Sequence, residues 1–297
     1  MFFVLEKQNE GSVGRMRDTH KKTKDISGEQ IEIQRIPLEG AKNIRDFGGF
    51  PTKDGKYIKP HHLLRSCELC VTTERDRKVL MQEYDLKKVL DFRTAKEREE
   101  HPDPVMDGVV NLHMPVLDEK ALGVTREGQD GDFLDQLAAS VMSPGFDATR
   151  YMSDIYEKII LSDNATRQYG RMFDELLAQE EGATLWHCTA GKDRAGIASI
   201  LVLSALDVPE AVVEADYFKV NDFLRDENEK LCRSVEDKMN NHRIHDGLMK
   251  MFIVHRAYIE KMFDTIKVHY GTMDGYLEKG LGLNRDKKEY LKQLCVS

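Results

Sequence analysis

Residues 183–206 read ATLWHCTAGKDRAGIASILVLSAL, and the expected architecture is built around this stretch. Its first four residues, Ala183 to Trp186, predict a short buried strand. From Ala195 to Leu206 the side chains are apolar on all sides, which is typical of a buried helix rather than a surface helix. Cys188 therefore lies in a loop between a strand and a helix, with backbone N–H groups near the helix N-terminus.

The loop carries Cys188 and Arg194 with five residues between them. A helix N-terminus has unsatisfied N–H donors and a partial positive charge, and both favour a bound anion. The same field stabilises a cysteine as its thiolate, which is the nucleophilic form. The arginine offers a planar fork to two phosphate oxygens, and Gly191 lets the backbone turn tightly. This order of residues is what a cysteine-dependent phosphate-ester hydrolase needs.

The phosphate is expected to bind along the loop itself, because successive backbone N–H groups form a nest around an anion of this size. The predicted phosphate-binding residues are Thr189, Ala190, Gly191, Lys192, Asp193 and Arg194. Two alternatives compete with a catalytic role. A lone buried cysteine is usually a small core residue, and a cysteine and an arginine at this spacing also occur by chance. The strand before the loop, its glycine and the helix after it favour catalysis by Cys188 and Arg194.

A hydrolase of this kind also needs a general acid that protonates the leaving oxygen. Asp193 in the loop ranks first as that acid. Asp91, at the end of a neighbouring predicted strand, ranks second, and Asp118 ranks third. The alternative for Asp91 is a buried ion-pair partner that orients Arg194 or Arg93.

Several polar residues near these segments are compatible with more than one role. Arg45, Asp46 and Arg65 belong either to the site or to a structural ion-pair set, and the sequence leaves both open. His187, directly before the cysteine, is expected to order the loop through a structural hydrogen bond rather than to move a proton.

The remaining pattern predicts one α/β domain. Residues 1–30 are polar and weakly periodic, which indicates a flexible N-terminal extension, and residues 31–297 form a single domain. Strand and helix patterns alternate, as in a mainly parallel central sheet with helices on both faces. The expected strands are an edge strand from Ile31 through Ile36, then 87–93 and 109–115, and a hairpin turn is expected at Asp54-Gly55. One helix is expected after a capping box at Thr94 and Glu97. The other expected helices are 73–83, 151–161, 165–179, 210–218 and one from Asn284 to Leu294.

Residues 222–266 contain two long helical patterns inserted before the last helix. The first half is densely charged with a narrow apolar stripe, and the second half has a clear stripe from Leu248 to Ile266. Such a pair is either a lid over the site or a helical hairpin that only widens the core.

Composition excludes several classes of protein. The chain has 297 residues and a formal net charge of −8, which argues against a general nucleic-acid binder, because binding to a phosphate backbone needs clustered positive charge. An anionic substrate stays open, since the local field of the loop decides its binding. No stretch approaches the ~20 apolar residues of a membrane span, so we expect no stable membrane insertion. Met1 to Leu5 is too short for a signal segment, which predicts a cytoplasmic location, or secretion if a signal peptide precedes this numbering.

The five cysteines are scattered and do not form the pattern of a disulfide framework. Cys67 and Cys70 have the spacing of half a zinc site, but no second pair follows at a suitable distance. We therefore expect no metal and no cofactor.

The stretch from His187 to Arg194 closely resembles the active-site loop of the atypical bacterial tyrosine phosphatases, a family whose members act on proteins and lipids. Other stretches of the chain are also similar to that family, and together the resemblance spans roughly residues 35–295. They are Asn43-x-Arg45-Asp46-x-Gly48-Gly49, Asp91-Phe92-Arg93 with Glu97 and Pro102 after it, and Tyr270-Gly271 through Asp274-Gly275-Tyr276-Leu277.

The resemblance implies the cysteine-phosphatase α/β fold, with residues 222–266 as a helical lid insertion. It implies hydrolysis of phosphotyrosine, with phosphoserine, phosphothreonine and phosphoinositides as further substrates, so the partners would be a phosphoprotein or a phosphoinositide. Lys192 inside the loop is the feature in which the chain resembles the lipid-directed members of the family, because an extra cation suits a head group with several phosphates. One residue departs from the common pattern: a Ser or Thr that assists breakdown of the phosphocysteine is replaced by Ala195.

Two other classes of function remain as alternatives. A rhodanese-like sulfurtransferase also places a cysteine between a strand and a helix, but it has no need of Arg194 at this spacing. A catalytically weak phosphate-binding module is the non-enzymatic alternative, and Ala195 gives it some support.

Overall fold

The computed structural model describes residues 33–117, 131–241 and 244–297. The predicted extension at residues 1–30 and the third-ranked acid, Asp118, lie outside the described residues.

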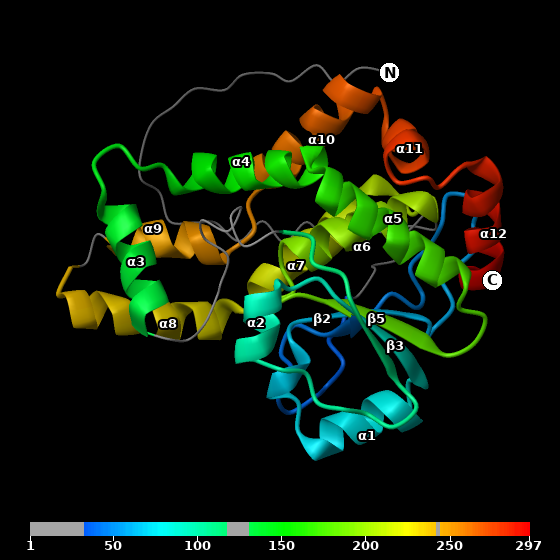
Figure 1. Ribbon diagram of the computed structural model, residues 1–297, viewed down its shortest axis with the longest axis horizontal. Coiled ribbons are helices and arrows are strands. Elements are labelled where there is room, and N and C mark those ends of the chain that lie inside the picture. The colour runs from blue at the N-terminus through cyan, green and yellow to red at the C-terminus, as the bar shows by residue number, and fades with distance from the viewer. Residues whose placement is uncertain (1–32, 118–130, 242–243) are drawn as a thin grey trace.

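A mainly parallel five-stranded sheet forms the centre of the domain, in the order β1-β2-β5-β3-β4 (Figure 1). The strands are β1 (Arg45–Asp46), β2 (Leu63–Ser66), β3 (Leu86–Asp91), β4 (Val110–His113) and β5 (Ala183–His187). Only β1 is antiparallel to its neighbour. Every residue of the central β5 is buried, as expected for a strand with a parallel neighbour on each side and helices on both faces. The predicted α/β class and parallel sheet are confirmed.

The register of the sheet brings three strand ends together below the cysteine loop. Ser66 of β2 and Asp91 of β3 both pair with His187, the last residue of β5. The carboxyl ends of these parallel strands therefore meet at one edge of the sheet, where sites collect in open α/β folds. The prediction that Asp91 lies at a neighbouring strand end is confirmed.

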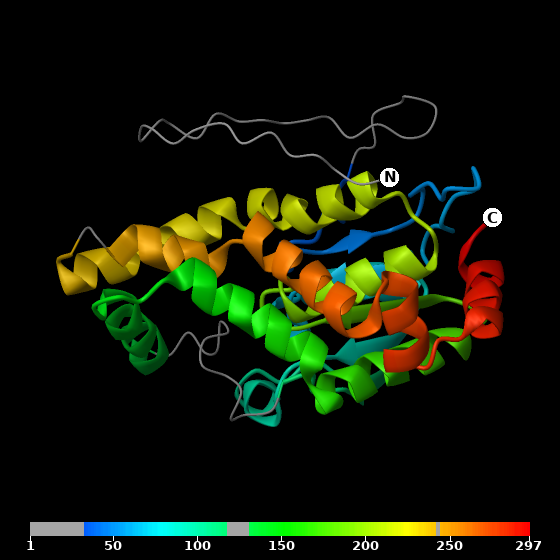
Figure 2. The same cartoon turned by 90° about the horizontal axis from the view of Figure 1, so that it is seen from above.

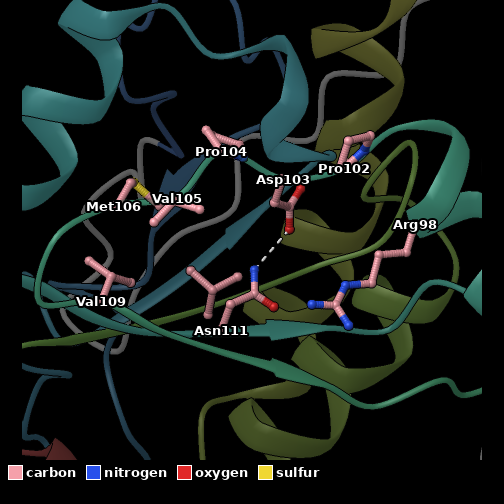
Figure 3. Close-up of a pocket in the computed structure, with 9 residues that line it drawn as sticks. Arg98, Pro102, Asp103, Pro104, Val105, Met106, Val109 and Asn111 are labelled. Atoms are coloured by element: carbon pink, nitrogen blue, oxygen red, sulfur yellow. Dashed lines mark hydrogen bonds between the residues drawn. The ribbon is translucent and has the colours of Figure 1, made fainter.

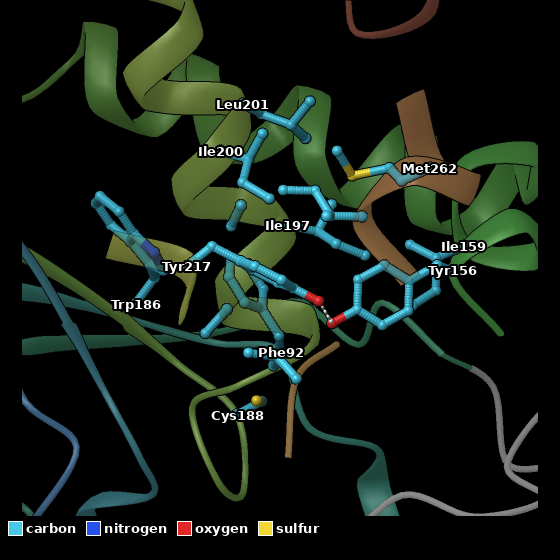
Figure 4. Close-up of a cluster of buried hydrophobic side chains, with 14 of the residues drawn as sticks. Phe92, Tyr156, Ile159, Trp186, Cys188, Ile197, Ile200, Leu201, Tyr217 and Met262 are labelled. Atoms are coloured by element: carbon cyan, nitrogen blue, oxygen red, sulfur yellow. Dashed lines mark hydrogen bonds between the residues drawn. The ribbon is translucent and has the colours of Figure 1, made fainter. Parts of the chain in front are cut away.

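Helices cover both faces of the sheet (Figures 1 and 2). On one face, α1 (Glu74–Gln82) packs with Leu80 against a cluster that includes Leu64 and Leu185. The larger core on the other face includes Trp186 and the nearly fully buried helix α6 (Arg194–Ala205; Figure 4). The helices that contribute to it include α4 (Ala148–Leu161), α5 (Asp163–Leu177), α6 (Arg194–Ala205), α7 (Glu210–Phe223), α10 (Arg256–Tyr270) and α12 (Arg285–Cys295).

Local capping signals in the sequence were reliable. Thr94 and Glu97 form both hydrogen bonds of a capping box at the start of α2 (Ala95–Glu100), and Asn284 caps α12. The described chain also contains three short elements, η1 (Leu69–Val71), α11 (Met273–Gly275) and η2 (Tyr276–Gly280).

The predicted N-terminal edge strand is wrong over the part that the structure describes. Ile33 and Ile36 are both buried, but they enter two different core clusters rather than one sheet face. Pro37 follows directly and offers no N–H to a sheet ladder. The turn at Asp54-Gly55 is present, with Gly55 at φ +81°, but a single bridge between Pro51 and Tyr57 stands in place of flanking strands.

The prediction of two long helices over 222–266 is also wrong, because three helices begin within this range after the end of α7 at Phe223. They are α8 (Arg225–Met239), α9 (Ile244–Phe252) and α10. Asn240 ends α8 in the left-handed conformation, at φ 47°, and the side chain of His255 accepts a hydrogen bond at the start of α10. α8 and α9 pack on each other and on α3 (Gly131–Met142), whereas α10 packs along α4.

None of the helices within the described ranges combines the length and the apolar composition needed to cross a lipid bilayer.

Candidate active site

The loop from Cys188 to Arg194 connects the carboxyl end of β5 to the N-terminus of α6, as the sequence predicts. Gly191 adopts φ +69°, and a Cβ added there would lie 2.4 Å from the carbonyl oxygen of Ser66. The conformation and the close approach each require glycine at this turn.

Neighbouring segments hold three successive carbonyl groups of the loop. The N–H of Glu68 donates to Thr189 O at 2.9 Å. Asn43 Nδ2 donates to Ala190 O at 2.8 Å, and Arg65 Nη2 donates to Gly191 O at 2.7 Å.

The loop N–H groups face the opposite way from these carbonyls. In the described part of the chain, the N–H groups of residues 189–194 have no protein acceptor. A run of unpaired N–H groups at a helix N-terminus is suited to hold the oxygens of a phosphate.

Arg194 is held in place by Glu97 of α2. Arg194 Nη1 and Nη2 donate to the two carboxylate oxygens, each at 2.6 Å, and both side chains are almost fully buried. Burial alone would raise the pKa of Glu97, but the Arg194 guanidinium lowers it to about 2. The hydroxyl of Thr189 also donates to Glu97 and lies 3.3 Å from Arg194 Nη2.

Cys188 lies at the border between the core and the loop, near Phe92, with 2% of its surface exposed (Figure 4). Burial alone would lower the pKa of Arg194, but Glu97 and then the charge of the Cys188 thiolate raise it. The structure thus brings the two predicted catalytic residues, Cys188 and Arg194, into one electrostatic unit.

Asp193, the first-ranked general acid, has two partners. Its Oδ1 accepts a hydrogen bond from Tyr156 at 2.9 Å, and its Oδ2 lies 2.6 Å from Lys192 Nζ. The Tyr217 hydroxyl donates to that of Tyr156 at 3.0 Å (Figure 4). Neither tyrosine has a signal in the sequence, because nothing in the pattern of a packed helix distinguishes a core tyrosine from one that contacts the site.

Asp91, the second-ranked acid, has the contacts of a structural residue. It is fully buried and accepts from Arg93 Nε and Nη2, both at 2.9 Å. Burial alone would raise the pKa of Asp91, but His187 and Arg93 lower it. These contacts favour the ion-pair alternative, with Arg93 as the residue that Asp91 orients, since Glu97 holds Arg194.

His187 makes the structural hydrogen bond expected of it. Its Nε2 lies 2.9 Å from Asp103 Oδ2 and 3.8 Å from Asp91, and its Nδ1 lies 3.2 Å from the carbonyl of Cys188. Asp103 also binds Arg93 at 2.9 Å and Asn111 at 3.1 Å, and it lines a cavity of about 200 Å³ between α2 and β4 (Figure 3). Burial alone would lower the pKa of His187, but Asp91 and Asp103 raise it.

The charged residues whose role the sequence left open separate into two groups. Arg45 and Arg65 are fully buried and both bind Asp216 of α7, at 2.5 Å and 2.7 Å. Asp46 instead accepts from the N–H groups of Gly48 and His61 and so fixes a turn. Asp216 had no signal in the sequence, because it lies 171 residues from Arg45 within an ordinary helical pattern.

Two groups of side chains bring metal-ligand atoms within 4.8 Å of one another among the described residues. The first is Asp91, Asp103 and His187, whose carboxylates Arg93 already binds. The second is Glu68, Cys70 and His101, so Cys70 lies near a histidine rather than forming a pair of zinc ligands with Cys67.

Comparisons with known proteins point to one family. The profile of the tyrosine phosphatase family matches residues 36–297. The triple specificity protein phosphatase PtpB of Mycobacterium tuberculosis is 28% identical over 266 residues, which cover 81% of this chain and 91% of that protein. A protein of Cupriavidus necator, provisionally named a tyrosine-protein phosphatase, is 26% identical over 250 residues, covering 83% and 84%. A tyrosine-protein phosphatase of Nostoc commune is 30% identical over 131 residues, covering 42% and 43%.

Proposed function

The chain belongs to the tyrosine phosphatase family, and we propose that it hydrolyses phosphate monoesters through a phosphocysteine formed on Cys188. The observation that carries the proposal is the loop: a cysteine, an arginine fixed by Glu97 and, among the described residues, a run of unpaired N–H groups lie together between β5 and α6. A sulfurtransferase has no use for the paired Arg194, and the family excludes that alternative.

In the first step the Cys188 thiolate attacks phosphorus, and the bond from phosphorus to the leaving oxygen breaks. The N–H groups from Thr189 to Arg194 and the Arg194 guanidinium hold the three equatorial oxygens. Donors that tighten in the transition state are each worth about 3–4 kcal/mol. The leaving oxygen takes the proton of the Asp193 carboxyl group, a transfer worth ~10²–10⁴-fold in rate.

The contact between Lys192 and Asp193 links this proton to substrate binding. Without substrate, the ammonium group of Lys192 neutralises the Asp193 carboxylate. A bound phosphate dianion offers Lys192 a second, more highly charged partner. Once the ammonium turns to the substrate, the Asp193 carboxyl group is released from this contact and can face the leaving oxygen.

In the second step water attacks the phosphocysteine, Asp193 accepts the proton of that water, and inorganic phosphate leaves with the thiolate restored. Ala195 is fully buried at the start of α6 and supplies no hydroxyl to this step. We propose that breakdown of the phosphocysteine is the slower of the two steps.

The experiment is hydrolysis of p-nitrophenyl phosphate by wild type and Cys188→Ser, with vanadate as inhibitor. The proposal expects vanadate-sensitive turnover by wild type and none by the variant. Absence of turnover by wild type would favour the phosphate-binding module, and equal turnover by the variant would contradict the cysteine mechanism.

Phosphotyrosine in proteins is the proposed substrate, and phosphoinositides are the second candidate. The observation that favours phosphoinositides is Lys192, a cation in the loop with only a few per cent of its surface exposed. The name of the mycobacterial relative ascribes three specificities to that protein, which supports breadth in this one. Phosphopeptide and phosphoinositide panels run with wild type and Lys192→Ala separate the two: an unchanged lipid-to-peptide ratio would remove Lys192 from specificity.

We propose that the lid is the arm of α3, α8 and α9 rather than all of residues 222–266. The arm lies on the side of the sheet where α2 follows the carboxyl end of β3 (Figure 1), and Lys238 of α8 binds Asp135 of α3 at 2.6 Å. α10 belongs to the body, because it packs along α4. If the arm closes over a bound oxyanion, vanadate should slow amide hydrogen exchange in α8 and α9. Unchanged exchange in these helices would mean that the arm is a structural extension and not a lid.

The cysteines support a reducing compartment such as the cytoplasm as the place of action. None of the five, all of which lie in the described residues, forms a disulfide, which is usual for cysteines in cytosolic proteins.

A further inference from the structure

We propose that Asp216 of α7 is a positioning residue for the phosphate loop and acts through Arg45 and Arg65. The inference rests on the proposed function, because it concerns the same loop. It assigns a role in the reaction to a helix that contributes no residue to the loop itself.

Asp216 lies between two arginines in a cluster that excludes water. Arg45 Nε donates to Asp216 Oδ1 at 2.5 Å, and Arg65 Nη1 donates to Oδ2 at 2.7 Å. Arg45 Nη2 also donates to the Asp216 backbone oxygen at 2.9 Å. No more than 1% of any of the three side chains is exposed, so each guanidinium has a fixed orientation.

Both arginines reach the loop from this cluster. Arg65 Nη2 donates to Gly191 O at 2.7 Å. Arg45 Nη1 donates to Asn43 Oδ1 at 2.7 Å, and the Asn43 amide then donates to Ala190 O at 2.8 Å. Two peptide groups of the loop are therefore oriented by Asp216 at a distance, with their carbonyls turned to the cluster.

The charge of the cluster has a consequence of its own. In the described structure, Lys192 is matched by Asp193 and Arg194 by Glu97, whereas two arginines share Asp216. The cluster thus leaves one net positive charge below the loop. Burial and the neighbouring Arg65 lower the pKa of Arg45 to about 10, which still leaves it charged at neutral pH.

Two effects of removing the Asp216 charge have opposite signs, which makes the proposal testable. If Asp216 mattered only through its field, its loss would raise the positive charge below the loop and tighten the binding of phosphate. If it positions the loop, its loss lets the arginines separate, because like charges repel when the anion between them is gone. The carbonyls of Ala190 and Gly191 then lose their orientation, and binding weakens.

The experiment uses the nearly isosteric Asp216→Asn, with kcat, KM and the Ki for inorganic phosphate measured on p-nitrophenyl phosphate. We expect kcat/KM to fall about 100-fold, the cost of a misplacement of about 1 Å, and the Ki to rise at least about tenfold. The shape of the pH profile should stay that of wild type, because the nucleophile and the acid are unchanged.

Arg65→Lys is the second variant and decides the question if Asp216→Asn does not fold. It keeps the charge but has a single ammonium group, which cannot hold both Asp216 and the Gly191 carbonyl in the geometry of the fork. We expect its Ki for phosphate to rise about tenfold.

The control is Asp76→Asn. Asp76 is equally buried, and it accepts from the backbone of Glu39, Gly40 and Thr73, away from the loop. Its loss should lower the melting temperature without changing the Ki.

Tighter binding of phosphate by Asp216→Asn, or kcat/KM and Ki within about threefold of wild type in folded Asp216→Asn, would overturn the proposal. If that variant does not fold, an unchanged Ki in Arg65→Lys would overturn it. Failure of the proposed function is distinct, since wild type itself would then not turn over.

Discussion

Replacing Glu97 by Gln removes one charge from the pair that fixes Arg194 and changes little else. Glutamine has nearly the same shape and is also accepted at this position of a capping box, so α2 should still begin at Ala95. The amide nitrogen, however, faces a guanidinium and cannot accept its hydrogen bond. One of the two 2.6 Å contacts is therefore lost, and Arg194 is free to rotate out of the plane that the phosphate needs.

The structure gives the magnitude for stability. Holding the pKa of Glu97 at about 2, rather than at its ordinary 4.5, corresponds to about 3 kcal/mol in favour of the ionised carboxylate. Because the folded pKa is depressed, this stabilisation is present above pH 4.5 and is lost as the pH falls towards 2. Glu97→Gln should thus be about 3 kcal/mol less stable than wild type at pH 7, and the difference should shrink to about half by pH 3.

For catalysis, the loss of a positioned transition-state donor costs ~10²–10³-fold in kcat/KM. The assay is hydrolysis of p-nitrophenyl phosphate beside urea denaturation across this pH range. Asp76→Asn is the matched control, because Asp76 holds the same capping-box position of α1, and among the described residues the donors to its carboxylate are backbone N–H groups rather than an arginine. Glu97→Gln with kcat/KM within about threefold of wild type, or with no loss of stability at pH 7, would refute the role of Glu97.

Three further predictions follow from other contacts. Asp91 and Asp103 raise the pKa of His187 against the effect of burial. Protonated His187 therefore stabilises the fold fully below pH 6.5, and this contribution is lost as the pH rises through the higher pKa of the folded state. The stability of His187→Gln in urea denaturation should lack that pH dependence, and an unchanged dependence would assign it to another group. Leu203 is fully buried in α6, so Leu203→Ala should lower the free energy of unfolding in urea by about 2–5 kcal/mol while kcat per folded molecule stays within about twofold. A loss below about 1 kcal/mol would show that neighbouring side chains fill the cavity. Ala195→Ser should speed release of phosphate and reduce the burst of product in rapid mixing, and an unchanged burst would mean that a hydroxyl there does not assist.

The sequence predicts the loop between a strand and a helix, with its two proposed catalytic residues, because these residues are contiguous in the chain. Cys188, Gly191 and Arg194 lie within one turn between a strand and a helix, so local rules of backbone and charge apply to them directly. The same holds for the capping box at Thr94 and for β5, every residue of which is buried at the centre of the sheet.

The supporting residues could not be predicted, because they come from distant elements. Glu97 was recognised as a helix cap, but nothing local shows that its free oxygens reach an arginine 97 residues later. Tyr156 and Asp216 lie in ordinary helical patterns and become part of the site only through packing. The break between α9 and α10, at residues 253–255, has no clear signal in the sequence, since the apolar stripe from Leu248 to Ile266 continues across it.

The most direct test of the central claim is to trap the covalent intermediate. Wild type is mixed rapidly with excess p-nitrophenyl phosphate, quenched in acid during turnover, digested and analysed by mass spectrometry. Slow breakdown beside Ala195 should let the adduct accumulate, and we predict a phosphoryl group on the peptide that contains Cys188, at the sulfur. A phosphoryl group on another side chain, or continued turnover by Cys188→Ser, would contradict the mechanism.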